Sequence, residues 1–256
     1  MTETKKELGQ HWLHDDSILD AIVEAGSVQS DESVLEIGPG LGTLTEKLMQ
    51  TGAKVTALEY DHDLIKNLEK KFRGTNVTIL QGDIRTFDFS SQSAPYKIIA
   101  NIPYYLTSHL IRSISETDNP PAHAVLLIQK EVAERLCAEK GSMSILAVTA
   151  QFYFTCSLSI EVPARFFTPP PKVDSQVVIL TRRTSPLFEV DEKRFIRLVK
   201  AGFSEKRKTL RNSLSGGLAI SKETAEVMLH DAGIDAGLRA QALDLSQWYA
   251  LYTHWK

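Results

Sequence analysis

Two kinds of hydrophobic pattern, short apolar runs and longer amphipathic stretches, alternate along the first two thirds of the chain. Short runs rich in Val, Ile and Leu show little alternation, which is typical of parallel strands covered on both faces. These predicted strands are Val34–Ile37, Val55–Glu59, Val77–Leu80, Ile98–Asn101 and Val125–Gln129. Longer amphipathic stretches predict helices at Ser17–Glu24, Leu44–Met49, Asp63–Phe72, Ser108–Ile114 and Glu131–Ala138. Strand–helix alternation predicts right-handed crossovers and an α/β, doubly wound sheet that is mostly parallel.

The pattern changes beyond about residue 150. Gln151–Val162 and Gln176–Thr181 are rich in β-branched and aromatic residues, which predicts an antiparallel addition to the sheet edge. No strand pattern remains from about residue 185 onward, and helices are expected at 191–202, 204–215, 222–232 and 246–255. The sequence therefore predicts a sheet-containing domain at 1–184 and a small helical domain at 185–256.

Composition narrows the class of protein. With 256 residues, 43% hydrophobic and 24% charged, the chain is long enough for a sizeable core and is neither disordered nor a coiled coil. Cys137 and Cys156 lie in no C-x-x-C pair, which excludes a disulfide framework and a zinc ribbon. The first residues lack a signal-peptide core, and no apolar run approaches the roughly 18 residues of a membrane span. We therefore expect a cytoplasmic protein without membrane contact.

The net charge of −3 argues against a protein that coats nucleic acid indiscriminately, but the charge is unevenly distributed. Residues 182–211 contain ten Lys and Arg against four acids. Within the predicted helix 204–215, Arg207 and Arg211 would share a face and Lys208 would lie beside Arg211. A basic surface is therefore expected there, although one charge run is usually just a solvated helix face. Its candidate residues are Lys206, Arg207, Lys208 and Arg211.

A glycine-rich loop, Gly38-Pro-Gly40-Leu-Gly42, follows the first predicted strand and opens a helix. Glycine suits a tight turn that a ligand must approach closely. A dinucleotide fingerprint requires G-x-G-x-x-G, but Thr43 stands where its third glycine would fall. Glu59 ends the second strand 21 residues beyond Gly38, where an acid can accept hydrogen bonds from both ribose hydroxyls of an adenosine. The loop is similar to the cofactor loop of class I S-adenosylmethionine-dependent methyltransferases.

Two further polar segments end predicted strands and point to the same edge of the sheet. Asp83 follows the third strand, where it is expected near the adenine of the cofactor. Asn101-Ile-Pro-Tyr104 ends the fourth strand and is similar to the [DNS]-P-P-[YF] block of amino-methyltransferases. The Asn101 side chain and the Ile102 carbonyl can hold the hydrogens of an exocyclic amine, while Tyr104 can stack on the base. This arrangement would turn the nitrogen lone pair toward the methyl group without a strong general base.

Four further blocks resemble one family, the rRNA adenine N6-dimethyltransferases, over nearly the whole chain. They are Leu8-Gly-Gln-His-Trp-Leu13, Gln129-Lys-Glu-Val-Ala-Glu-Arg135, Phe167-Thr-Pro-Pro-Pro-Lys-Val-Asp-Ser175 and Phe203-Ser-Glu-Lys-Arg-Lys-Thr-Leu-Arg211. The resemblance implies a Rossmann-like methyltransferase sheet and S-adenosyl-L-methionine as cofactor. It also implies dimethylation of two adjacent adenosines near the 3′ end of small-subunit (16S) rRNA, with a role in small-subunit biogenesis. The expected partners are the small ribosomal subunit precursor and its rRNA, with no metal and a monomeric enzyme.

The same resemblance assigns individual site residues. Those expected at the cofactor are His11, Leu13, Gly38, Gly40, Glu59, Asp83, Ile84 and Asn101. Those expected at the target adenine are Asn101, Ile102, Tyr104 and Phe167, the last closing the other face of the base unless it merely packs in the core. The resemblance of segment 206–211 to a family block favours phosphate contact by its basic residues over a merely solvated face. Trp12 and Tyr105 depart from the family, which more often has Phe and Asn there.

Three other functions compete with this interpretation. A nicotinamide-dependent oxidoreductase shares the fold, but the missing third glycine and the Asn101–Tyr104 block count against it. A largely non-catalytic ribosome-assembly factor is disfavoured by the intact Glu59, Asp83 and Asn101. A resistance-type large-subunit rRNA methyltransferase shares the Asn-Ile-Pro-Tyr block, yet usually lacks the 129–135 and 206–211 blocks as they stand here.

Overall fold

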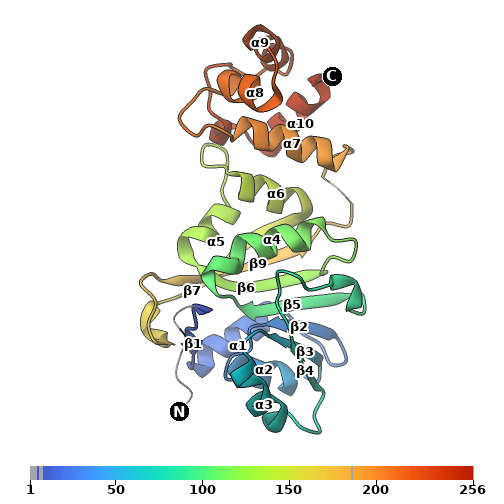
Figure 1. Cartoon of the computed structure of the whole chain (residues 1–256), viewed down its shortest axis with the longest axis vertical. Coiled ribbons are helices and arrows are strands. Elements are labelled where there is room, and N and C mark those ends of the chain that lie inside the picture. Colours follow the sequence, from blue (N-terminus) through green and yellow to red (C-terminus); the bar gives the residue numbers. More distant parts are fainter. Residues whose placement is uncertain (1–4, 6–7, 186, 256) are drawn as a thin grey trace. The chain divides into compact units, whose positions relative to one another are not determined.

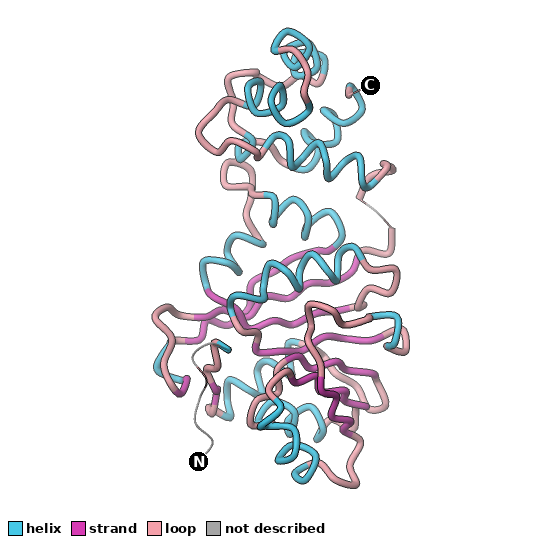
Figure 2. The backbone as a smooth tube through the Cα atoms, in the orientation of Figure 1, coloured by secondary structure: helices cyan, strands magenta, loops and turns pink. Residues whose placement is uncertain are grey.

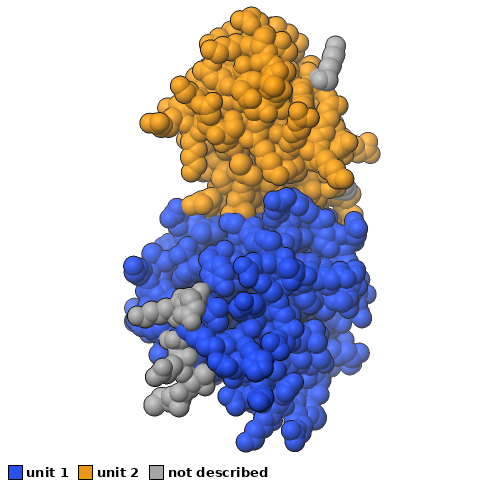
Figure 3. Space-filling model, in the orientation of Figure 1, with its two compact units in different colours: residues 1–134, 154–182 blue, residues 135–153, 183–256 orange. Residues whose placement is uncertain are grey.

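The computed structural model describes residues 5, 8–185 and 187–255 of the chain. The chain forms two compact units (Figure 3). The sheet unit comprises residues 1–134 and 154–182, and the helical unit comprises residues 135–153 and 183–256. The last crossing between units, at 182/183, lies two residues from the predicted domain boundary at 184/185. Residues 135–153, which the sequence placed with the sheet, belong instead to the helical unit.

In the described part of the sheet unit, seven strands form one sheet in the order β4-β3-β2-β5-β6-β9-β7 (Figure 1). The strands are β2 (Ser33–Ile37), β3 (Lys54–Glu59), β4 (Val77–Gln81), β5 (Tyr96–Asn101), β6 (His123–Gln129), β7 (Phe154–Val162) and β9 (Ser175–Arg182). The first five pair in parallel, and β9 pairs antiparallel with both β6 and β7. The predicted fold class, a doubly wound parallel sheet with an antiparallel edge, is confirmed.

Helices lie between most of the parallel strands, as the sequence predicts (Figure 2). The connecting helices are α2 (Thr43–Gln50), α3 (His62–Lys71) and α4 (Thr107–Glu116), while α1 (Asp16–Ala25) precedes β2 and α5 (Lys130–Leu136) follows β6. Side chains cap two of them, because Asp15 accepts from the Ile18 N–H at α1 and Asp61 accepts from the Asp63 N–H at α3. Ile22 of α1 is fully buried in the main core cluster, so the extra helix before the sheet covers apolar strand residues.

Residues 151–153 correct the sequence prediction, because they end helix α6 (Ile145–Tyr153) and β7 begins only at Phe154. Helix α6 is apolar on nearly all sides, and periodicity cannot distinguish such a buried helix from a strand. Its residue Phe152 stacks on Phe195 with ring centroids 5.0 Å apart, which ties α6 to the helical unit. A second small sheet, β1 (Trp12–Leu13) antiparallel to β8 (Phe167–Thr168), also had no clear sequence pattern.

The helical unit contains α7 (Glu192–Gly202), α8 (Leu210–Leu218), α9 (Lys222–Asp231) and α10 (Leu245–His254) in addition to α6. Trp248 of α10 is fully buried and stacks on Phe203, with ring centroids 5.5 Å apart. Helix α8 begins at Leu210 rather than 204, because Thr209 adopts the extended conformation of an N-cap residue. Arg207 and Lys208 therefore lie in a turn, and the predicted shared helix face of Arg207 and Arg211 is wrong.

No helix within the described ranges is long and apolar enough to cross a membrane.

Candidate cofactor and acceptor site

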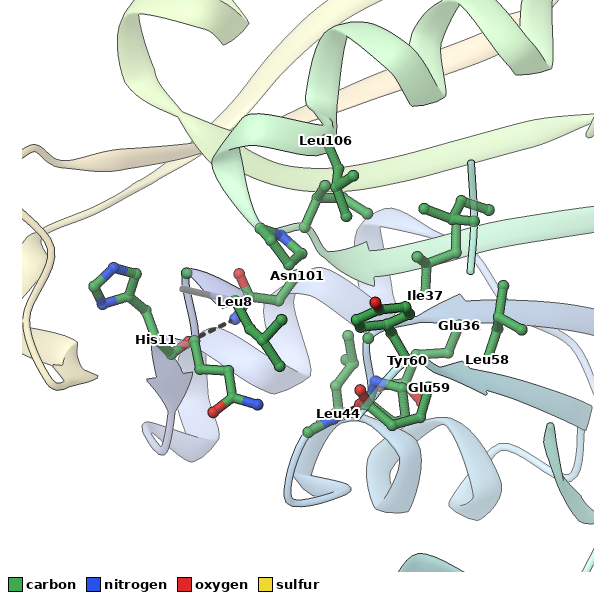
Figure 4. A pocket seen from close by; sticks show the side chains of 18 of the residues that line it. Leu8, His11, Glu36, Ile37, Leu44, Leu58, Glu59, Tyr60, Asn101 and Leu106 are labelled. Carbon is green, nitrogen blue, oxygen red and sulfur yellow. Dashed lines mark hydrogen bonds between the residues drawn. The ribbon is translucent and has the colours of Figure 1, made fainter. Parts of the chain in front are cut away.

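A cavity lies at the carboxyl ends of β2, β3 and β5 (Figure 4). Nearly all of the predicted cofactor and acceptor residues line it, and these are His11, Leu13, Gly38, Gly40, Glu59, Asp83, Ile84, Asn101, Ile102 and Tyr104. They come from five separate segments of the sheet unit. The structure thus brings together residues that the sequence linked only by pattern and resemblance.

The glycine loop requires glycine for two physical reasons. Gly38, Gly40 and Gly42 have φ values of 70°, 58° and 74°, in the left-handed region that side chains disfavour. A Cβ on Gly42 would lie 2.7 Å from Phe72, and one on Gly40 would lie 3.2 Å from Trp12. The loop therefore packs closely on both neighbours and leaves its backbone open toward the cavity. Trp12, one of the two departures from the family, packs against this loop.

Glu59 is fixed by backbone donors at both of its carboxylate oxygens. Its Oε2 accepts from the Gly40 N–H at 3.0 Å, and its Oε1 accepts from the Asp61 N–H at 2.7 Å. The side chain is only 6% exposed, and burial raises its pKa while the backbone donors act in the opposite direction. The carboxylate is therefore held in one orientation, with remaining lone pairs available to a diol in the cavity.

Glu36, in β2, is a second buried acid that lines the cavity. It is 1% exposed, and its Oε2 has no hydrogen-bond partner among the described residues. Burial, assisted by the charge of Glu59, raises the pKa of Glu36 to about 8. The Glu36 carboxyl is therefore mostly protonated at neutral pH.

Asp83 lines the cavity, and its carboxylate forms an ion pair with Arg85. Arg85 Nη2 is 2.6 Å from Asp83 Oδ2, and the Arg85 guanidinium lowers the pKa of Asp83. The exposed aromatic side chains Tyr60 and Tyr105 line the same cavity. The sequence analysis missed Arg85 and Tyr60, since neither belongs to a motif of distinctive composition.

The acceptor segment is fixed from two sides. Asn101 Nδ2 donates to the His11 carbonyl at 3.1 Å, so the amide nitrogen is engaged and Oδ1 is the free acceptor end (Figure 4). The Tyr104 hydroxyl and the Ser175 hydroxyl are hydrogen bonded at 2.8 Å. The His11 ring stacks on Tyr104 with centroids 5.9 Å apart, and its Nδ1 donates to the Pro169 carbonyl at 2.7 Å. These contacts join the N-terminal segment, β5 and the Pro-rich loop into one wall.

Phe167 is the one predicted acceptor residue that the structure does not bring to the cavity. Its side chain is 3% exposed and packs in the main core cluster with Leu13 and Leu19. The reason is its place in β8, because pairing with Leu13 of β1 places it in the core. The position of Phe167 therefore agrees with ordinary core packing. This geometry does not support stacking of Phe167 on the target base.

The predicted RNA-binding residues lie in the helical unit. Lys206, Arg207 and Lys208 are exposed in the turn before α8, and no described carboxylate forms an ion pair with them. Arg211 differs, because its Nη1 lies 2.9 Å from Glu226 Oε2 of α9. Three of the four candidate cations are thus available to an anionic partner, while the fourth has an internal one.

The fold and the cavity define the class of protein, an α/β methyltransferase with a Rossmann-like sheet and its ligand site at the carboxyl ends of the strands. The family model described as ribosomal RNA adenine dimethylase matches residues 1–256. The chain belongs to this family.

Several relatives agree with that assignment. The chain is 40% identical to ribosomal RNA small subunit methyltransferase A of Dehalococcoides mccartyi strain BAV1, over 97% of this chain and 87% of the relative. It is 39% identical to the protein of the same name from Nostoc sp., over 98% of this chain and 97% of the relative.

Two solved structures are also similar over nearly their full length. A dimethyladenosine transferase from Plasmodium falciparum has a TM-score of 0.81 at 29% identity, covering 94% of this chain and 96% of that one. The 23S rRNA methyltransferase ErmE has a TM-score of 0.77 at 29% identity, and the match covers 95% of this chain and 98% of that one. The fold is therefore shared with a structure whose name specifies 23S rRNA, whereas the sequence relatives are named for the small subunit.

Proposed function

We propose that this chain dimethylates the N6 amines of two adjacent adenosines near the 3′ end of small-subunit (16S) rRNA, with S-adenosyl-L-methionine as methyl donor. The observation that carries the proposal is that Asn101, Ile102 and Tyr104 line the same cavity as the glycine loop and Glu59. An acceptor for an amine thereby lies beside an adenosine-type site. The roughly 40% identity to small-subunit relatives supports the choice of rRNA.

The residues of the cavity fit the proposed cofactor. The Glu59 carboxylate, fixed by the Gly40 and Asp61 N–H groups, suits the ribose hydroxyls. Asp83 and Ile84 suit the adenine, and the left-handed glycine loop allows close approach of the ligand to the backbone. When bound, S-adenosylmethionine supplies an electrophilic methyl group.

The acceptor segment handles the target amine. Because Asn101 Nδ2 donates to the His11 carbonyl, Asn101 Oδ1 is presented as an acceptor for one amine hydrogen. The Ile102 carbonyl accepts the other hydrogen, and the Ile102 N–H is anchored on the Leu127 carbonyl at 3.1 Å. The Tyr104 ring stacks on the base and favours the positive charge that develops on the nitrogen. The product nitrogen loses its proton readily, so no strong general base is required.

The helical unit would dock the RNA. We propose that the exposed cations Lys206, Arg207 and Lys208 contact phosphates, which makes the helical unit the RNA-binding part and the sheet unit the catalytic part of the chain, in place of the predicted bounds 1–184 and 185–256. The proposed partner is a precursor of the small subunit, which would place the protein in the cytoplasm. A monomeric enzyme that uses no metal also stays a prediction.

The test of the proposed function compares two substrates. Small subunits lacking the modification and protein-free large-subunit rRNA are each incubated with the protein and labelled S-adenosylmethionine, and the modified nucleotide is mapped. We expect two dimethylated adjacent adenosines in the small subunit. Methylation of the large-subunit rRNA alone would favour the resistance-type activity instead.

Two further measurements exclude the remaining alternatives. S-Adenosylhomocysteine should raise the melting temperature and NAD should not, whereas the reverse result would indicate an oxidoreductase. Asn101→Ala should abolish methyl transfer and leave RNA binding largely intact. Transfer near the wild-type rate would show that Asn101 is not the acceptor for the amine.

A further inference from the structure

Arg85 engages both carboxylate oxygens of Asp83. Oδ1 accepts from the Arg85 backbone N–H at 2.9 Å and from Nε at 3.0 Å. Oδ2 accepts from Nε at 2.9 Å and from Nη2 at 2.6 Å. The single Nε hydrogen is shared between the two oxygens, so three Arg85 N–H groups engage a carboxylate that has about four lone-pair sites. An amine that binds Asp83 must therefore compete with the Arg85 side chain for these oxygens.

Little holds the Arg85 guanidinium in this position apart from Asp83. The Arg85 side chain is 53% exposed, and no second carboxylate in the described ranges forms an ion pair with it. Exposed ion pairs contribute little net free energy, because water and mobile ions compete with both partners. The pair can therefore open at low cost when a better donor reaches Asp83.

A displaced guanidinium would stay at the cavity mouth beside exposed aromatic rings. Tyr60 and Tyr105 line the same cavity as Arg85 and are 55% and 58% exposed. Cations interleaved with exposed aromatic rings are the chemistry by which proteins hold single-stranded nucleic acid, since the cation meets phosphate and the rings meet bases. Arg85 in its displaced position would thus face an RNA strand that enters the cavity.

We propose that Arg85 couples cofactor binding to RNA binding. In the observed geometry it neutralises Asp83. When the cofactor's adenine amine binds Asp83, the guanidinium is released to a phosphate of the RNA strand that carries the target adenosine. The inference rests on the proposed function, in which Asp83 accepts that amine. Coupling of this kind is reciprocal, so RNA would tighten cofactor binding by the same factor.

The test measures both equilibria on the full-length protein. Calorimetry gives the affinity for S-adenosylhomocysteine. Fluorescence anisotropy gives the affinity for a short single-stranded RNA with two adjacent adenosines, with and without saturating S-adenosylhomocysteine and over a series of salt concentrations. For the wild type we expect the ligand to tighten RNA binding by about fivefold or more. We also expect it to steepen the salt dependence by about one phosphate contact.

Arg85→Met keeps an unbranched apolar stem and removes the guanidinium with its charge. This variant should bind S-adenosylhomocysteine at least as tightly as the wild type, because Asp83 is no longer masked, and it should lose the coupling. Arg112→Met is the matched control, since Arg112 is also an exposed arginine whose Nε contacts both oxygens of a carboxylate, that of Glu116. The control should keep the wild-type coupling.

The outcomes separate this inference from the proposed function. Wild-type protein that fails to bind S-adenosylhomocysteine would overturn the proposed function. Normal ligand binding with equal RNA affinity in the empty and loaded states would overturn the coupling alone. Coupling that persists in Arg85→Met would also overturn the coupling proposal. A tenfold or greater loss of S-adenosylhomocysteine affinity in Arg85→Met would overturn it as well, because Arg85 would then support ligand binding at Asp83 instead of competing with the ligand.

Discussion

The backbone N–H of Gly40 donates a 3.0 Å hydrogen bond to Oε2 of Glu59, which lies 19 residues further along the chain. This bond joins the loop after β2 to the end of β3, so the glycine loop and the acid form one structural unit. Glu59 therefore has two roles, because it holds the loop in its left-handed conformation and presents its carboxylate to the cavity. The loop and the acid, which the sequence offered as separate signals, depend on each other.

Glu59→Gln should weaken S-adenosylhomocysteine binding by about 10- to 100-fold, the size expected for losing a hydrogen bond to a charged group. The amide turns one acceptor oxygen into a donor, which opposes either the Gly40 or the Asp61 N–H. Calorimetry measures the change. Glu46→Gln is the control, since Glu46 pairs with Lys71 on the surface at 3.0 Å. Equal affinities for Glu59→Gln and the wild type would contradict a role for Glu59 in ligand binding.

Gly42→Ala should destabilise the protein more than Gly74→Ala. Both glycines have nearly the same positive φ, 74° and 76°, so the backbone strain of the substitution is matched. The added Cβ at residue 42 would lie 2.7 Å from the buried Phe72 ring, whereas nothing lies within 4 Å at residue 74. Overpacking of this kind costs about 1–3 kcal/mol, which denaturant unfolding can resolve. Similar losses for the two variants would show that Phe72 yields without cost.

The sequence predicted the parallel strands and their helices well, because a buried apolar run followed by an amphipathic helix leaves a strong local pattern. It misplaced residues 151–153, since the apolar residues of α6 carry no period that separates a helix from a strand. It also misjudged the basic block, because Thr209 starts α8 later than composition suggested. Local patterns do not report where a helix begins when the residues before it, here 204–209, are all polar.

The site shows the same division between local and long-range information. Gly38, Glu59, Asp83 and Asn101 end strands or follow them, so the topology of a parallel sheet is enough to bring them to one edge. The burial of Phe167 depends instead on the pairing of β8 with β1, across more than 150 residues of sequence. Contacts at that separation leave no trace in a local pattern.

Glu36 should contribute a loss of stability as pH rises from about 5 to 8. Burial raises the pKa of Glu36 in the folded protein to about 8, so the folded state holds a proton that the unfolded state has lost above its ordinary pKa. Since the native state binds more protons in this window, the free energy of unfolding decreases with pH, by at most about 1.4 kcal/mol per pH unit from this group.

Glu36→Gln removes this titration and should flatten the pH dependence of urea unfolding between pH 5 and 8. Glu24→Gln, at an exposed position on α1, is the control and should keep the wild-type slope. A Glu36→Gln profile parallel to that of the wild type would mean that another group causes the dependence.

The turn before α8 should supply more RNA affinity than α8 itself. Lys206→Ala and Lys208→Ala remove cations that form no ion pair with a described residue, so each should weaken RNA binding and lower the salt slope by about one. Arg211→Ala should have a smaller effect, because Arg211 is already paired with Glu226. Anisotropy with small-subunit rRNA over a salt series measures all three. A larger loss for Arg211→Ala than for the two lysines would contradict the assignment of the turn as the phosphate contact.

Tyr104 should contribute to methyl transfer through its ring rather than its hydroxyl. The hydroxyl is bonded to Ser175 at 2.8 Å, so Tyr104→Phe should cost about 1 kcal/mol of stability and leave the rate of transfer nearly unchanged. Tyr104→Ala removes the stacking surface and should lower the rate by about tenfold to a hundredfold, since stacking on an aromatic ring contributes about 1–3 kcal/mol per base. Single-turnover methylation at saturating S-adenosylmethionine measures both rates, and S-adenosylhomocysteine binding checks that each variant keeps its cavity. The contrary result is that Tyr104→Phe is as slow as Tyr104→Ala while both variants still bind S-adenosylhomocysteine. Since the hydroxyl is the group that both variants lack, the hydroxyl and its bond to Ser175 would then be the essential feature.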